Sequence, residues 1–156
     1  MSPPANKESR ESTGIFGYAE YLYTAKFPDS RIPPGTAFRI AAEISNSVPD
    51  FIVASSGAGG TVFTLGPGAY IVDCEMSLPS ATSIAIYSGP DSTSLSMYAN
   101  TISGSSTRTA WIHGRGIEHV STPMVIAISS IANPNHILSD IPRHSYIIRL
   151  TIIKIM

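Results

Sequence analysis

Three side chains in the second half of the chain have the chemistry of metal ligands. His113 and His119 flank the stretch 114–116 (Gly-Arg-Gly), and Glu118 precedes His119. If this stretch is the turn of a hairpin, the two histidines lie on facing strands, within reach of one ion. Zinc would still need a third and a fourth ligand, and the order His-x4-Glu-His matches no helical zinc motif. We therefore expect histidines on a hairpin surface rather than a metal site.

Other reactive residues lack the surroundings that catalysis needs. Cys74, the single cysteine, lies in an apolar alternating run, where a small buried thiol is expected. Asp73 and Glu75 share a strand face, roughly 6 to 7 Å apart, as solvated outer-face carboxylates do. The stretch 57–60 (Gly-Ala-Gly-Gly) is followed by neither Lys-Ser/Thr nor a helix start, and Gly-x-Ser-x-Gly does not occur. We predict no catalytic, cofactor-binding or metal-binding residues.

The elements that would position these side chains are strands. After a turn at 66–68 (Gly-Pro-Gly), five apolar residues alternate with polar ones on a single strand: Tyr70, Val72, Cys74, Met76 and Leu78. Further strands are expected at 15–25, 37–44, 51–54, 83–87, 95–102, 107–113, 117–120, 124–130 and 145–156. The stretch 37–44 also suits a short helix, and 55–60 is a loop by composition. Short strands at this spacing indicate an all-β sandwich or barrel.

Length and composition favour one domain with no direct contact to nucleic acid and no membrane span. The 156 residues predict a polar arm at 1–14 and a single domain at 15–156. Ten Lys and Arg stand against eleven Asp and Glu, so the basic excess that phosphate binding needs is missing. No apolar run approaches the ~20 residues of a membrane span. The first residues lack the apolar centre of a signal peptide, so we expect no secretory signal.

The last strand indicates contact with another chain. One parity of 145–156 is apolar from Tyr146 to Ile152, and the other parity carries Ile147, Ile153 and Ile155. A strand that is apolar on both sides is either central in the stack or pressed against another chain. Trp111, the single tryptophan, fits either the core or an interface anchor. We predict an oligomer interface formed by Trp111, Ile147, Ile153 and Ile155.

Residues 63–72 (FTLGPGAYIV) resemble the strand-turn-strand signature of the tumour-necrosis-factor (TNF) and C1q-like jelly rolls. Those modules have an aromatic or leucine strand, a proline-glycine turn, then Gly-x-Tyr and an alternating strand. The resemblance implies a trimeric module that binds a receptor or a glycan through its loops. This chain departs from the family at 149–156 (RLTIIKIM), where C1q-like modules usually end in a short Phe-x-Gly strand.

The size, the polar arm and the content of Ser, Thr, Gly and Pro also resemble viral single jelly-roll proteins. That resemblance implies a penton or minor capsid component of a large DNA virus. In the arm, Lys7 and Arg10 are balanced by Glu8 and Glu11, which implies a shell component that does not touch the genome.

The sequence therefore predicts an all-β, antiparallel jelly-roll sandwich that is not an enzyme and needs no cofactor. We expect it to assemble with itself, as a trimer or pentamer, and with other capsid proteins in a virion. The alternative is a trimeric TNF/C1q-like recognition module. A cupin-type enzyme comes third, because it needs two or three histidines and a carboxylate on facing strands, which His113, Glu118 and His119 supply only in part.

Overall fold

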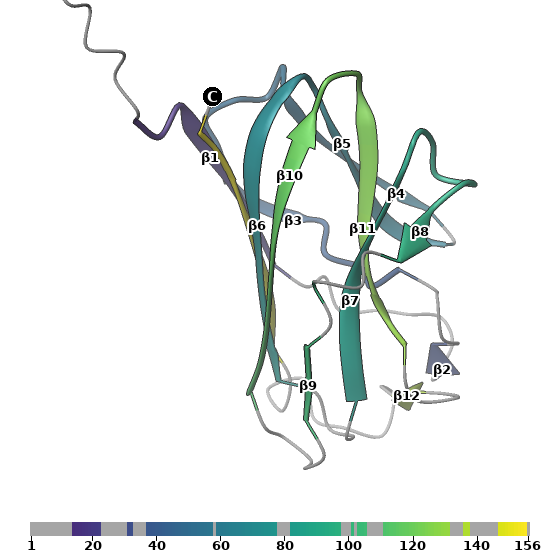
Figure 1. Ribbon diagram of the computed structural model, residues 1–156. Coiled ribbons are helices and arrows are strands. Elements are labelled where there is room, and N and C mark those ends of the chain that lie inside the picture. The colour runs from purple at the N-terminus through teal and green to yellow at the C-terminus, as the bar shows by residue number, and fades with distance from the viewer. Residues whose placement is uncertain are drawn as a thin grey trace, which may run out of the picture.

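The chain forms a sandwich of two antiparallel sheets, shown as a computed structural model in Figure 1. The structure describes residues 14–22, 31–32, 37–57, 59–77, 82–97, 101, 103–105, 111–131, 136–137 and 147–155. The five-stranded sheet has the order β10 (Trp111–Val120), β6 (Gly68–Ser77), β13 (Ile147–Lys154), β1 (Gly17–Leu22) and β3 (Ala42–Asn46). The six-stranded sheet has the order β4 (Ile52–Gly57), β5 (Gly60–Leu65), β11 (Met124–Ser130), β7 (Thr82–Gly89) and β8 (Ser96–Met97), and β9 (Ser103–Ser105) also pairs with β7. Two short strands, β2 (Arg31–Ile32) and β12 (His136–Ile137), pair with each other.

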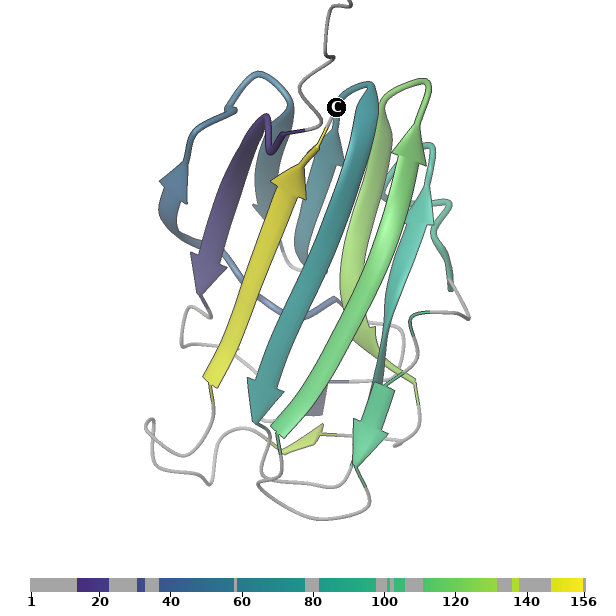
Figure 2. The ribbon, with the colours of Figure 1, turned by 60° about the vertical axis from the view of Figure 1, so that its left-hand side comes forward.

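The strand order confirms the predicted all-β jelly roll. The C-terminal strand β13 lies between β6 and β1, so both ends of the described chain meet within one sheet, as Figure 2 shows for the yellow and purple strands. β11 likewise lies between β5 and β7 in the other sheet. Such crossovers between strands that are distant in sequence are typical of Greek-key sandwiches. Among the described residues, no helix is long and apolar enough to cross a lipid bilayer.

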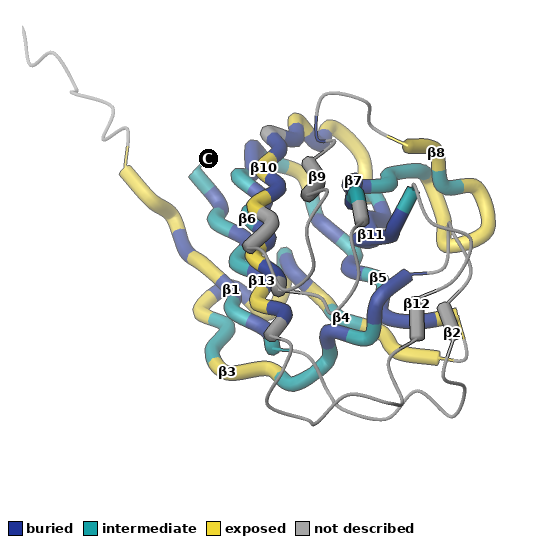
Figure 3. Tube along the Cα trace, turned by 90° about the horizontal axis from the view of Figure 1, so that it is seen from below, coloured by how far each residue is buried: buried dark blue, intermediate teal, exposed yellow. Residues whose placement is uncertain are grey.

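Alternation of apolar and polar residues builds the core between the two sheets. The predicted inward residues of β6 are all buried from Tyr70 to Met76, and Leu78 lies outside the described residues. β13 buries Ile148, Leu150 and Ile152 beside them. Figure 3 shows the resulting alternation of buried and other segments along the strands. Full burial of one such side chain contributes about 1.5–3 kcal/mol, so the two alternating strands account for much of the core.

The hairpin predicted at 114–116 is wrong, because β10 runs unbroken from Trp111 to Val120 and pairs with β6 along its whole length. The glycines have a different purpose. A Cβ at position 116 would lie 2.8 Å from Ile86 Cδ1 and from Thr101 Cγ2, and Gly114 faces Ile84. Both glycines are therefore needed where the edge strand approaches the opposite sheet closely.

Two further predictions were wrong in part. The loop expected at 55–60 is mostly strand: β4 continues through Gly57, and β5 begins at Gly60 in a tight hairpin. Gly60 has a φ of +96°, and a side chain there would clash with the Ala37 carbonyl. The strand expected at 37–44 begins only at Ala42, while Phe38 crosses between strands by donating to the Ile128 carbonyl and accepting from Thr61. A helix at 37–44 is excluded by these bonds.

The polar arm predicted at 1–14 falls almost wholly outside the described residues, so the arm and the domain boundary remain predictions. Gly14 and Ile15 are exposed, and Phe16 attaches this end to β13 by donating its N–H to the Lys154 carbonyl at 2.8 Å.

Candidate interaction surface

The outer face of the five-stranded sheet carries an apolar row that crosses three strands. The register pairs Tyr18 of β1 with Ile153 of β13, and Ile153 with Ile71 of β6. Tyr18 is exposed, and the two isoleucines are half-buried. The next position in line, on β10, is Ile117. We call Tyr18, Ile153 and Ile71 the apolar row. Contiguous apolar surface on the outside of a sheet is a candidate site for contact with another molecule.

Below the apolar row, the same face is polar and paired. Arg149 Nε lies 3.1 Å from Glu20 Oε1, which joins β13 to β1. Asp73 accepts from Arg115 at 2.7 Å and is also bonded to His113, which joins β6 to β10. Burial raises the pKa of Asp73, but the bonds from Arg115 and His113 outweigh it and hold that pKa below its usual value. Two ion pairs of this face, Glu20 with Arg149 and Asp73 with Arg115, thus form within one chain.

The structure separates the three candidate metal ligands. His113 and His119 lie on the same strand, six residues apart, which corresponds to about 20 Å. Both are exposed on the outer face, whereas Glu118 is buried on the inner face. The described residues contain no group of three His, Cys, Asp or Glu side chains that could hold a metal ion.

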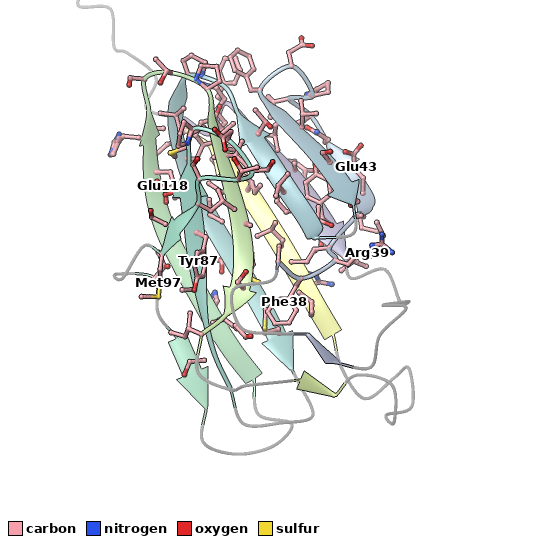
Figure 4. All side chains as sticks on the ribbon, turned by 90° about the vertical axis from the view of Figure 1, so that its right-hand side faces the viewer. Phe38, Arg39, Glu43, Tyr87, Met97 and Glu118 are labelled. Atoms are coloured by element: carbon pink, nitrogen blue, oxygen red, sulfur yellow. The ribbon has the colours of Figure 1, made fainter. Side chains whose placement is uncertain are left out.

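Glu118, which the sequence offered only as a candidate metal ligand, is a buried carboxylate. It is 7% exposed, it faces Tyr70 across the β10–β6 pair, and its Oε1 has no hydrogen-bond partner. Burial raises the pKa of this carboxyl above its usual value. Figure 4 shows Glu118 on the same side of the sandwich as Tyr87 and Met97, opposite Arg39 and Glu43. Glu118 alternates in step with Gly114 and Gly116, which also face inward, and on a continuous strand this spacing predicts its burial. The expected hairpin at 114–116 interrupted that pattern.

Lys154 is a second buried charge, on the other side of Tyr70. It is 4% exposed, and its Nζ lies 4.8 and 4.7 Å from the ring centres of Phe16 and Phe51. The ring centre of Tyr70 lies 5.6 Å away, and the Tyr70 hydroxyl donates to the Gly66 carbonyl at 2.8 Å. An ammonium within about 6 Å of aromatic faces gains a cation–π interaction. We call the rings of Phe16, Phe51 and Tyr70 the aromatic cage. The cage stabilises the charge of Lys154, which lies on the buried side of β13.

The predicted interface residues fall on one sheet. Ile153 belongs to the apolar row, and Ile155 is half-buried just beyond it, donating its N–H to the Ala69 carbonyl. Trp111 and Ile147 both pair with Ser77, on its two sides. Their side chains lie outside the described residues, so the four-residue interface remains a prediction. Cys74 is buried as expected, which raises the pKa of its thiol.

The hollows of the described surface include two of similar volume. One, of about 280 Å³, lies where β6 begins and β10 ends, and is lined by Gly68, Ala69, His119, Val120 and Ser121. The other, of about 270 Å³, lies between the β4–β5 hairpin and Ser92, and is lined mainly by serines and glycines. Neither has the buried polar groups and apolar walls of a small-molecule site.

Comparison with known proteins supports the fold. No protein-family model matches the chain, and no curated protein matches it in sequence. The globular domain of zebrafish complement 1qA protein is 12% identical, with 90% of this chain and 98% of that chain covered and a TM-score of 0.63. The Eiger TNF of S. frugiperda is 9% identical, with 91% of this chain and 94% of that chain covered, and the TM-score is 0.59. Murine APRIL at pH 5.0 is 6% identical, with 88% of this chain and 98% of that chain covered, and the TM-score is 0.52.

At these identities the likeness establishes the fold alone. The TNF/C1q-like signature predicted at 63–72 is confirmed, because β5, the turn and β6 occupy it in a fold of this kind. The expected capsid identity gains no support from these three structures.

Proposed function

We propose that the chain is a self-associating, non-enzymatic recognition module of the TNF/C1q-like kind. It forms a trimer through the outer face of the five-stranded sheet and binds a receptor or a glycan through its loops. The observation that carries this proposal is the apolar row of Tyr18, Ile153 and Ile71, aligned across three strands on an outer face.

The rest of that face supports association. A second copy that covers the apolar row removes it from water, and complete burial of one side chain of this size contributes about 1.5–3 kcal/mol. The neighbouring charges are already paired within the chain, as Glu20 with Arg149 and Asp73 with Arg115. A second copy that covers these ion pairs does not leave their charges unpaired, and burying an unpaired charge at an interface is what costs free energy.

The test is the native mass of the purified protein at micromolar concentration. We expect a trimer, and a monomer that persists at high concentration contradicts the proposal. A pentamer supports the capsid component and its place in a virion instead. Glycan arrays and receptor capture with the trimer then identify the ligand class.

A further inference from the structure

The outer side of β4, at the margin of the six-stranded sheet, presents backbone groups to a further strand. Gly57 pairs with Gly60 at the hairpin, and hydrogen-bonded pairs alternate with non-bonded pairs along an antiparallel ladder. Ala54 and Ser56 therefore direct their N–H and C=O groups away from β5. Among the described residues, none of these four groups has a hydrogen-bond partner. We call the outward N–H and C=O groups of Ala54 and Ser56 the open edge.

The first residue of β4 supports this orientation. Ile52 lies two residues before Ala54 and directs its backbone groups to the same side. Its N–H donates to the Val48 carbonyl at 3.1 Å, and its carbonyl accepts from Asn46 Nδ2 at 2.9 Å. The chain thus covers the outer side of β4 at Ile52, and the open edge begins at Ala54.

The other strands at the margins of the two sheets have features that block strand addition. Such features are short length, charged side chains, irregular pairing and charges that point inward. β8 and β9 have only two and three residues. β3 carries Glu43, and its pairing with β1 contains a register shift. β10 carries Arg115 and buries Glu118. β4 (IVASSG) has six residues, with neither a charge nor a proline.

Charges at the two ends of β4 define the chemistry of a partner. Arg39 Nη2 lies 3.5 Å from the Gly57 carbonyl at the end of the strand, and Figure 4 shows Arg39 on this side of the sandwich. Asp50, which is exposed, precedes the start of the strand. Antiparallel pairing is slightly more stable than parallel pairing, and it puts the N-terminal end of an added strand beside Arg39. An acidic residue at that end and a basic residue at the other end complement these charges.

We propose that β4 binds an extended segment of a partner protein as an added antiparallel strand, acidic at its N-terminal end and basic at its C-terminal end. The hollow of about 270 Å³, lined in part by Ser55, Ser56 and Gly57, leaves space for a side chain of that segment. Main-chain hydrogen bonds supply the affinity in this mode of recognition, and side chains supply the specificity. The open edge belongs to the sheet opposite the apolar row, so this inference goes beyond the proposed function and does not depend on it.

Peptide binding by the full-length protein tests the added strand. Peptides selected on the unaltered protein from a displayed random library serve as probes, and each is synthesised again with N-methyl groups on alternate residues. Methylation of one alternate set removes the N–H donors that face β4 and should weaken binding about tenfold or more. The other set faces solvent, and its methylation should change binding by less than about twofold. If no selected peptide shows this difference between the two sets, the proposal is overturned.

A matched pair of variants locates the binding site. Ser56→Pro removes the outward N–H at a position where an outer strand tolerates proline, and Ser56→Ala keeps that N–H. The probes should bind Ser56→Pro about tenfold or more weakly, and should bind Ser56→Ala as they bind the unaltered protein. Equal binding to the two variants would exclude the open edge as the site.

Amide hydrogen exchange of the unaltered protein tests the same contact without a variant. The probes should slow exchange at Ala54 and Ser56 and leave Val53 and Ser55 unchanged, because the last two already pair with β5. Slow exchange at Ala54 and Ser56 without a probe would mean that a second copy covers the open edge, which overturns the proposal. Native mass is measured in parallel, and a monomer that binds the probes in this way contradicts the proposed trimer while it supports the added strand.

Discussion

In the five-stranded sheet, charged Lys154 and Glu118 lie on the inner face while Tyr18, Ile71 and Ile153 line the outer face. The six-stranded sheet is arranged in the ordinary way. Its described inward residues are aliphatic, aromatic or hydroxyl-bearing, and its two exposed large apolar residues, Val53 and Met97, lie on opposite edges. Isolated apolar residues on a surface are normal, whereas an aligned row is not. The difference supports the proposal that the chain associates through the five-stranded sheet.

The largest effect on stability is expected at the aromatic cage. Lys154→Ala should lower the free energy of unfolding by about 2–4 kcal/mol, because it removes the cation–π contacts and leaves a cavity. Lys154→Met fills the cavity without the charge and should lose about half as much. Urea unfolding of both variants measures the difference. If Lys154→Met were as stable as the unaltered protein, the charge inside this sheet would contribute nothing.

A comparable loss is expected where the two sheets approach most closely. Gly116→Val should cost about 1–3 kcal/mol through overpacking against Ile86 and Thr101. Gly57→Ala is the matched control, since a Cβ there meets nothing within 4 Å, and it should change stability by less than about 0.5 kcal/mol. Thermal unfolding of the two variants compares them directly. Equal stability would mean that β10 does not pack against the opposite sheet as described.

A smaller effect is expected at Glu118, and it depends on pH. The pKa of Glu118 is raised in the folded protein, so the folded state holds the proton more tightly than the unfolded state does. The contribution of this group to stability is complete below the ordinary pKa of 4.5 and is lost as pH rises through the folded pKa. Glu118→Gln should therefore flatten the fall in unfolding free energy above pH 4.5. Urea titrations at a series of pH values measure it, and an unchanged slope contradicts the assignment.

The smallest effect is expected at the paired charges of the outer face. Asp73→Asn removes the ion pair with Arg115, which is exposed, so the loss of unfolding free energy at neutral pH should be small. Because the pKa of Asp73 is lowered, its contribution is present above the ordinary value of 3.8 and is lost as pH falls through the folded pKa. The two proteins should thus converge in stability in strong acid. A difference that persists there would point to packing rather than charge.

Sequence patterns predicted the fold where one face alternates without interruption. β6 is the example, because Tyr70 to Met76 alternate with polar residues along a single strand. The run 124–130 also forms a single strand, β11, but it is buried continuously from Val125 to Ser130 and does not alternate. Glycine was misleading, since composition does not distinguish a turn from a close approach of two sheets, as at Gly114 and Gly116. The apolar row depends on strand pairing between distant segments, which no local pattern reveals. The burial of Lys154 and Glu118 was not predicted, because charged residues are almost always exposed.

The central claim is that the chain associates through the outer face of the five-stranded sheet. Sedimentation equilibrium of Ile153→Glu beside Val53→Glu tests it most directly, because the two variants add the same charge to opposite faces of the sandwich. An unpaired charge buried at an interface costs about 3–5 kcal/mol, so Ile153→Glu should sediment as a monomer where the unaltered protein and Val53→Glu remain trimers. An Ile153→Glu protein that keeps the unaltered mass, or a Val53→Glu protein that also dissociates, would contradict the account.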